Sequence, residues 1–313
     1  MVSREFDVVT GAFGYTGKYI TRRLLAKGRE VKTLTGHPQR AASSNGHIEV
    51  ARLQFERPAE LVQSLRGATT LYNTYWVRFP HHGVTYEKAV ENSRTLITAA
   101  REAGVQRIVH LSITHPSPDS KLGYFRGKAE VEQAIAASGL TYAILRPTVI
   151  FGVEDILINN IAWLLRRAPA FAIPGSGRYR LQPVYVVDVA EMAVAAGQES
   201  RNVVADAVGP EIFTFEQLVR IVAVNVGSRA RILHLPPFMA LWLSRQVGRA
   251  VHDVVLTKEE VEGLMASLLV SQAEPTGRTR FSEWINRHAH LLGIHYASEL
   301  SRHFRKNEKG PSP

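Results

Sequence analysis

The chain has 313 residues, of which 45% are hydrophobic, and its 38 Lys and Arg against 28 Asp and Glu give a net charge of +10. A chain of this length can bury a large core, as one large domain or as a core domain with a smaller lobe. The positive charge favours acidic partners such as phosphorylated cofactors, nucleic acid or anionic lipid. Because the basic residues form no stripe with interleaved aromatic residues, nucleic acid is not the expected partner.

Cysteine is absent from the chain. Disulfide bonds, thiol catalysis and thiolate metal sites are therefore excluded. The twelve histidines show no spacing typical of a metal site, so no bound metal is expected. The N-terminus shows no cationic and then apolar leader, and no apolar run approaches the length of a transmembrane segment. The cytoplasm is therefore the expected compartment.

The most informative motif lies near the N-terminus. Apolar residues lead into three glycines spaced three apart, Gly11, Gly14 and Gly17, and a helical pattern follows that ends at Gly28. The start of a helix presents free backbone N–H groups and the positive end of the helix dipole, and both attract a diphosphate. This order of strand, glycine turn and helix predicts a dinucleotide site. The contacts expected from this stretch are Thr10, Gly11, Phe13, Gly14, Tyr15, Thr16 and Gly17.

The first half of the chain alternates strand-like and helix-like segments. Gly28, Gly104 and Gly139 follow helical stretches, where a left-handed residue ends a helix. Alternating strands and helices indicate right-handed βαβ units and an α/β fold, a doubly wound parallel sheet covered by helices on both faces. The expected strands are 6–10, 30–35, 47–51, 68–73, 106–112 and 141–146, and the expected helices are 16–27, 58–66, 86–103 and 123–138.

The second half is less regular. Proline and glycine interrupt the chain between Pro169 and Pro183. Two capping boxes, which begin at Thr214 and Thr257, then predict helix starts, and the last third is expected to be mainly helical. The predicted organisation is a dinucleotide-binding core over 1–152 completed by about 182–208, a smaller lobe for substrate or partner over 153–181 and 209–304, and a flexible tail over 305–313.

One segment of the expected smaller lobe is strongly apolar. Residues 236–243 carry no charge, and Arg245 and Arg249 follow them. Such a segment can form a helix on a membrane surface or a buried helix of the lobe. The polar residues show poor helical periodicity, which favours the buried helix.

The residues after the second expected strand bear on the choice of nucleotide. In a doubly wound sheet an acidic residue at this point binds the ribose 2′-hydroxyl of NAD, whereas basic groups accommodate the 2′-phosphate of NADP. Glu30 lies at the opposite end of the strand, while His37 and Arg40 lie close to the expected position. NADP(H) is therefore the favoured cofactor, and NAD(H) is the alternative. Further cofactor contacts are expected from Thr35, Gly36, His37 and Arg40 after the second strand, from Gln54 and Phe55 after the third, and from Asn73, Thr74 and Tyr75 after the fourth.

Tyr124 and Lys128 lie four residues apart at the start of the helix after the fifth strand. This spacing places both on one helix face, where the lysine ammonium lowers the pKa of the tyrosine. Such a tyrosine can give or take a proton as hydride moves to or from a carbinol carbon. Ser112 ends the fifth strand, where its hydroxyl can hold a substrate oxygen, and Asn92 can anchor a water molecule or the lysine. These four residues form the candidate catalytic site.

Together these motifs resemble the short-chain dehydrogenase/reductase superfamily, in its extended or atypical branch. A closer similarity, through residues 146–155 and 182–189, is to the NADPH-binding accessory subunit of respiratory complex I and its bacterial relatives. The resemblance implies a Rossmann fold with a smaller, mainly helical C-terminal substrate lobe. The residues that carry it are Thr10, Gly11, Gly14, Gly17, Asn92, Ser112, Tyr124 and Lys128.

The resemblance also implies a role for each matching residue. Tyr124 would be the acid/base, Lys128 would hold the nicotinamide ribose, and Ser112 would polarise the substrate. Tyr75 and Trp76 replace the small residues of relatives, and their rings could narrow the substrate space or seal in the cofactor. The residues implied to line the nicotinamide are Pro147, Thr148, Val149 and Ile150, and those expected to face the substrate are Tyr75, Trp76, Thr114, Asn159, Arg178 and Arg180.

Three functions stay open at this point. The first is an NAD(P)-dependent oxidoreductase that acts on a small-molecule carbonyl or alcohol, and the Tyr–Lys spacing favours it. The second is a non-catalytic protein that holds NADPH and works through a protein or membrane-associated partner, as in complex I. The third is a nucleotide-sugar epimerase or dehydratase, which needs a second phosphate site. The candidate phosphate ligands for it are Arg166, Arg167, Arg178 and Arg180.

Overall fold

The computed structural model describes residues 5–39, 48–81 and 83–303. The chain divides into two compact units. Unit 1 comprises Met1–Pro147 and Val186–Ala207, and unit 2 comprises Thr148–Tyr185 and Val208–Pro313. The predicted Arg40 contact and the expected tail from residue 305 lie outside the described residues.

Unit 1 is built on a seven-stranded parallel sheet with the strand order β3-β2-β1-β4-β5-β6-β11. The order reverses at β1, and the carboxyl ends of all the strands lie at one edge. This is the geometry in which open α/β sheets bind ligands. The strands are β1 (Phe6–Thr10), β2 (Glu30–Thr35), β3 (Glu49–Arg52), β4 (Ala68–Asn73), β5 (Arg107–Leu111), β6 (Thr141–Pro147) and β11 (Val203–Ala207).

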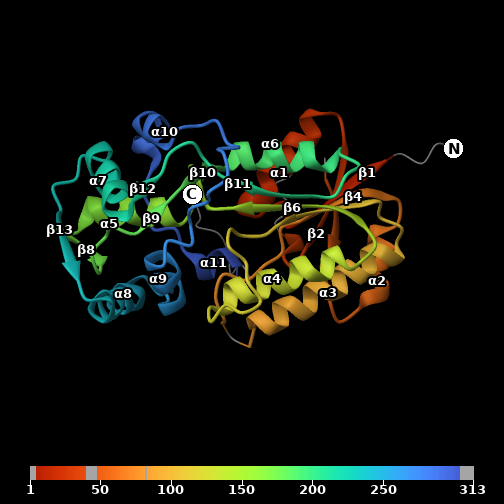
Figure 1. The fold of residues 1–313 in the computed structure, drawn as a ribbon, viewed down its shortest axis with the longest axis horizontal. Helices are drawn as coiled ribbons and strands as arrows, with labels where there is room; N and C mark the ends of the chain where they lie inside the picture. Colours follow the sequence, from red (N-terminus) through yellow and green to blue (C-terminus); the bar gives the residue numbers. More distant parts are fainter. Residues whose placement is uncertain (1–4, 40–47, 82, 304–313) are drawn as a thin grey trace. The chain divides into compact units, whose positions relative to one another are not determined.

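Helices cover both faces of this sheet (Figure 1). The helices α1 and α6 pack together on one face, and α2, α3 and α4 pack side by side on the other. The central strands β1, β4 and β5 are mostly buried because helices cover both of their faces, and the prediction of a doubly wound α/β fold is confirmed. The helices are α1 (Tyr15–Ala26), α2 (Pro58–Leu65), α3 (Tyr86–Glu102), α4 (Gly123–Ala136) and α6 (Val186–Gly197).

As far as residue 303, unit 2 is mainly helical, with three short two-stranded sheets. The strand pairs are β7 (Val149–Phe151) with β10 (Pro183–Tyr185), β8 (Ala170–Pro174) with β13 (Arg231–Leu235), and β9 (Arg180–Leu181) with β12 (Phe213–Thr214). Its core includes Phe151, Phe281 and Trp284, whose rings contact one another. The helices are α5 (Leu157–Arg167), α7 (Phe215–Asn225), α8 (Pro237–Val251), α9 (Lys258–Met265), α10 (Phe281–His288), the 3-10 turn η2 (Ala289–Leu291) and α11 (Glu299–His303).

Local predictions for unit 2 are confirmed in one case and wrong in another. The capping boxes at Thr214 and Thr257 both form, each with reciprocal side-chain and backbone bonds. The apolar segment 236–243 does begin a helix, α8, but the prediction that this helix is buried is wrong. Phe238 and Trp242 are 72% and 57% exposed, because α8 rests on unit 2 through small residues rather than large ones.

Candidate functional site

The glycine turn between β1 and α1 has the geometry of an anion site. Gly11 has a φ of +67°, and its carbonyl accepts a 2.8 Å hydrogen bond from the N–H of Gly14. A Cβ on Gly17 would lie 2.2 Å from the Gly11 carbonyl oxygen, so only glycine fits there. Helix α1 follows with no side-chain cap and no acidic residue in its first turn, which leaves the positive end of its dipole open to an anion.

The side chains at the ends of β1 and β4 are joined to each other. The Thr74 N–H donates to Thr10 Oγ1 at 2.7 Å, and Thr74 Oγ1 donates to the Thr10 carbonyl at 2.5 Å. The Tyr75 N–H donates to Asn73 Oδ1 at 3.0 Å. At the end of β2, Thr35 Oγ1 accepts from the His37 N–H at 3.0 Å. These predicted contact residues therefore shape the backbone of the sheet edge.

Tyr75 and Asn92 contact each other rather than the lysine. The Asn92 amide Nδ2 donates to the Tyr75 hydroxyl at 2.9 Å, and the Tyr75 ring packs on Phe55 with centroids 4.8 Å apart. Burial raises the pKa of Tyr75 above its ordinary value. The sequence predicts that Asn92 anchors a water molecule or the lysine. Its Oδ1, the atom that could accept from the ammonium, has no partner among the described residues, so Asn92 does not bind Lys128, and the water alternative stays a prediction. Gln54 and Phe55 are half-buried beside β3.

Lys128 is the most buried charged group at this edge of the sheet. It is 3% exposed, and its Nζ donates to the Leu111 carbonyl at 2.7 Å, which ties α4 to the end of β5. Burial lowers the pKa of Lys128 to about 7, against the opposing charge of Glu132. Tyr124 lies one turn earlier in α4 and is half-buried.

Trp76 covers this part of α4. The Lys128 Nζ lies 4.7 Å from the centroid of the indole, and the Tyr124 ring meets the indole edge-on at 5.8 Å. A Cβ on Gly127 would approach the indole to 2.8 Å, so the glycine makes room for the ring. Sequence reasoning placed Trp76 in the substrate space but missed its contact with the lysine. The glycine between Tyr124 and Lys128 is the one local signal of that contact.

Several buried polar atoms near the carboxyl ends of β4 and β5 have no hydrogen-bond partner among the described residues. They include Ser112 Oγ, Asn92 Oδ1 and Trp76 Nε1. His110 Nε2 is a fourth; its Nδ1 faces the donating amide of Asn73 at 3.1 Å, so Nε2 carries the proton. Burial, with the charge of Lys128, holds the pKa of His110 well below its ordinary value. Unsatisfied buried polar atoms are costly, so their gathering at one edge indicates a ligand site. His110 was missed by sequence reasoning because it lies within a strand.

One predicted substrate contact of unit 1 is wrong. Thr114 is completely buried, and its backbone N–H donates to the Pro147 carbonyl at 3.2 Å. The residue therefore fixes the chain after β5 to the end of β6, and its side chain has no exposed surface for a substrate.

In unit 2 the predicted site residues mostly stabilise backbone. Thr148 Oγ1 donates to the Gln182 carbonyl, and Val149 and Ile150 form β7. Asn159 is 7% exposed: its Nδ2 donates to the carbonyls of Val153 and Asp155, and its Oδ1 accepts from the Gly293 N–H. The prediction that Asn159 faces the substrate is therefore wrong. The guanidinium groups of Arg166 and Arg167 donate to backbone carbonyls. Arg166 donates to those of Leu292, Val226 and Ala289, and Arg167 donates to those of Trp163, Gly293 and Ile294.

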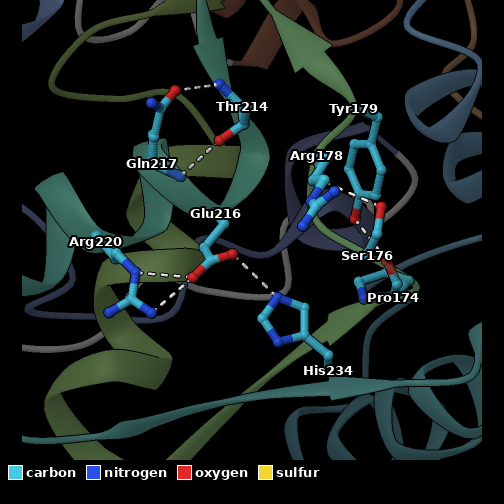
Figure 2. A network of polar contacts seen from close by, with 9 residues as sticks. All are labelled: Pro174, Ser176, Arg178, Tyr179, Thr214, Glu216, Gln217, Arg220 and His234. Atoms are coloured by element: carbon cyan, nitrogen blue, oxygen red, sulfur yellow. Dashed lines mark hydrogen bonds and ion pairs between the residues drawn. The ribbon is translucent and has the colours of Figure 1, made fainter.

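Arg178 and Arg180, like Arg166 and Arg167, are exposed, but in the described part of the chain no backbone carbonyl accepts a bond from their guanidinium groups. The Arg178 N–H donates to Ser176 Oγ at 3.3 Å in the turn after β8, and the Arg180 N–H donates to Ser267 Oγ at 3.1 Å. Figure 2 shows the neighbouring network, in which Glu216 accepts bonds from Arg220 and contacts His234. The bond from Arg220 lowers the pKa of Glu216.

Comparison with known proteins shows which kind of nucleotide the first unit is built to bind. Residues 11–154 match the family described as NAD(P)H-binding. This segment belongs to that family. The NAD(P)H-binding domain therefore includes the glycine turn, Ser112, Tyr124 and Lys128, and the predictions of a Rossmann fold and a nicotinamide cofactor are confirmed.

The relatives of this chain include reductases and complex I subunits, and the structures with a similar fold include epimerases. The chain is 25% identical over 246 residues to the mitochondrial NADH dehydrogenase [ubiquinone] 1 alpha subcomplex subunit 9 of Arabidopsis thaliana, a match that covers 75% of this chain and 61% of that protein. It is 28% identical over 297 residues to the (4-alkanoyl-5-oxo-2,5-dihydrofuran-3-yl)methyl phosphate reductase of Streptomyces griseus, with 90% and 97% covered. The NADPH complex of an Escherichia coli NADPH-dependent quinone oxidoreductase has a similar fold, with a TM-score of 0.72, 22% identity, and 90% and 99% covered.

The residues of the NAD(P)H-binding domain fit a dinucleotide. The cradle that Gly11, Gly14 and Gly17 form leaves no room for a Cβ at its third glycine, and the open start of α1 suits a diphosphate. Beyond β2, the described residues place Gly36 exposed and His37 half-buried at the expected adenosine end.

Among the described residues, no group of three or more His, Asp or Glu has a geometry that could hold a metal ion. No helix in the described part of the chain combines the length and apolar character needed to cross a membrane.

Proposed function

We propose that the chain is an NADP(H)-dependent oxidoreductase that reduces a small-molecule carbonyl or oxidises the matching alcohol. The observation that carries this proposal is the buried Lys128, which lies one turn from Tyr124 and donates to the Leu111 carbonyl. Ser112 follows Leu111, and its buried hydroxyl has no hydrogen-bond partner within the described part of the chain. A buried lysine whose pKa lies near neutrality is typical of a functional site. The reductase relatives support the same class of reaction.

The proposed chemistry needs one proton and one hydride. Bound NADPH would supply the hydride to the carbonyl carbon. The Tyr124 hydroxyl would give its proton to the carbonyl oxygen, which yields the alcohol, and solvent would then reprotonate the phenolate. The role of Ser112 is to hold the carbonyl oxygen by donating a hydrogen bond. In its charged form, Lys128 would stabilise the negative charge that develops on the Tyr124 oxygen as the proton leaves.

The decisive test is Tyr124→Phe, with Tyr142→Phe on β6 as the matched control. We expect Tyr124→Phe to lower kcat by about 10²- to 10⁴-fold, the usual contribution of a general acid, with NADPH affinity retained. Stopped-flow consumption of NADPH with a panel of aldehydes, ketones and quinones measures the rate. Equal rates for Tyr124→Phe and the wild type would contradict the catalytic role of this tyrosine.

The second candidate function is a protein that holds NADPH and acts through a partner. Trp76 favours it, because the indole lies over Lys128 and meets Tyr124, and so occupies space next to both. This function predicts stoichiometric NADPH released when the purified protein is denatured, and no turnover in either tyrosine variant. A site that exchanges NADPH freely and turns over a carbonyl substrate supports the enzyme instead.

A further inference from the structure

Helix α8 presents an apolar face that unit 2 leaves exposed. Phe238 and Trp242 are 72% and 57% exposed, and Met239 and Leu243 are 42% and 36% exposed. Only Ala240 and Gly248 of this helix are buried. Large aromatic side chains exposed as a cluster are uncommon on a soluble surface and indicate contact with another apolar phase or partner.

The exposed face of α8 is also cationic at its far end. Phe238, Trp242, Arg245 and Arg249 are spaced by four, three and four residues, so they follow one side of the helix. Both arginines are exposed, and α8 contains no acidic residue. The face is therefore apolar over its first two turns and positively charged over its last two.

We propose that α8 attaches this protein to an anionic lipid surface. The rings of Phe238 and Trp242 would insert among the acyl chains near the headgroups, where Trp is favoured. The guanidinium groups of Arg245 and Arg249 would bind lipid phosphates in the same plane. The net charge of +10 adds attraction to an anionic leaflet.

Charge decides between a lipid surface and the other occupants of such a face. A second copy of the chain would place the arginines of two α8 helices on a shared apolar patch, with no acidic residue of α8 to pair with them. An anionic bilayer supplies both the apolar phase and the negative charge. The proposal concerns unit 2 alone and does not depend on the oxidoreductase activity.

The experiment is sedimentation of the 313-residue chain with vesicles, at low and at high salt. One set of vesicles contains phosphatidylcholine alone, and the other contains equal amounts of phosphatidylcholine and phosphatidylglycerol. We expect binding to the anionic vesicles that weakens with salt. Equal binding to both vesicles, or no binding to either, overturns the proposal.

Two pairs of variants locate the contact. Phe238→Ser with Trp242→Ser should weaken binding to the anionic vesicles at least about tenfold, because the inserted apolar area is lost. Arg245→Gln with Arg249→Gln should weaken it about 10- to 30-fold and remove most of the preference for anionic lipid. Matched controls are Val224→Ser, an exposed apolar residue of α7, and Arg66→Gln with Arg101→Gln, two exposed arginines of unit 1.

All the substituted α8 side chains are exposed, so each variant is expected to fold, and unchanged thermal unfolding checks this. Wild-type binding by both α8 pairs would overturn the proposal. So would a concentration-dependent dimer, seen by sedimentation velocity, that Phe238→Ser with Trp242→Ser dissociates without any loss of vesicle binding. Loss of binding by both α8 pairs and retention by the controls supports it.

Discussion

Buried polar groups at the sheet edge of unit 1 differ from the two buried asparagines of α5 in unit 2. In unit 1, Ser112 Oγ, Asn92 Oδ1 and His110 Nε2 are buried, and no described residue gives them a hydrogen-bond partner. All three lie near the carboxyl ends of the central strands. In unit 2, both polar atoms of the Asn159 side chain are occupied by backbone groups, as are those of Asn160.

This difference distinguishes buried groups that can bind a ligand from buried groups that stabilise the fold. A buried polar group that already has its partners stabilises the backbone it binds and offers nothing to a ligand. A buried group without partners is tolerated where a ligand will supply them. Residue type alone does not reveal this distinction: Asn92 and Asn159 are both buried asparagines in helices.

The comparison predicts its largest effect for Asn159→Ala, on stability alone. The variant leaves the carbonyls of Val153 and Asp155 and the N–H of Gly293 without their bonds, so we expect the free energy of unfolding to fall by about 3–4 kcal/mol. Denaturant unfolding measures it. Asn225→Ala removes one bond to a backbone carbonyl and should cost about 1 kcal/mol. Equal losses in the two variants would contradict the structural role given to Asn159.

The next largest effect is expected for Gly17→Ala, on cofactor binding. The added Cβ would lie 2.2 Å from the Gly11 carbonyl oxygen, so the diphosphate cradle must shift. We expect NADPH affinity to fall by about 100-fold, equivalent to about 2.7 kcal/mol, as measured by fluorescence titration.

Gly104→Ala is the control for Gly17→Ala. Its φ of +77° makes alanine strained, but Gly104 lies at the end of α3 with open space around it. It should lower stability by about 1 kcal/mol and leave the affinity unchanged. A normal affinity for Gly17→Ala would contradict the proposed cradle.

The sequence predicts the architecture of unit 1 because its signals are local. Apolar runs for strands buried on both faces, helical periodicity and helix-ending glycines each lie within one segment; Gly28, Gly104 and Gly139 all adopt positive φ. In unit 2 the signals are not local. Strands β9 and β12 have two residues each and pair across more than thirty residues of chain, so no periodicity marks them.

The candidate site divides in the same way. Glycine spacing predicts the turn geometry at Gly11 and Gly17, which is set by neighbouring residues. The contact of Trp76 with Lys128 joins the end of β4 to α4, about fifty residues away, and depends on how the helix packs on the sheet. The exposure of Phe238 likewise depends on which side of α8 meets unit 2. A composition that is apolar all along the segment does not specify that side.

The pH dependence of stability tests the burial of Lys128. Its pKa falls from an ordinary value of 10.5 to about 7 in the folded protein. Between these values the unfolded chain binds more protons, so stability rises with pH from about 7 to 10.5, and below pH 7 the full cost is present. Lys128→Met should remove this slope, which is about 1.4 kcal/mol per pH unit.

Denaturant unfolding at several pH values measures that slope for the wild type, for Lys128→Met and for Lys121→Met, an exposed lysine that serves as the control. The Lys121→Met curve should run parallel to the wild type. Parallel curves for all three proteins would show that Lys128 keeps an ordinary pKa. Burial would then not distinguish Lys128 from the exposed Lys121.

The smallest expected effect tests whether Trp76 is part of the site or only covers it. Gly127→Ala places a Cβ 2.8 Å from the indole and should destabilise the protein by about 1–2 kcal/mol. In a Trp76→Phe background the smaller ring relieves this contact, so the cost of Gly127→Ala should largely vanish, a coupling of about 1 kcal/mol in a double-mutant cycle.

If the indole also limits the substrate space, Trp76→Phe alone raises kcat/KM for bulky carbonyls over small ones. Additive stability effects would mean that the indole does not rest on Gly127, and the cover over Lys128 would then have to be assigned to another group.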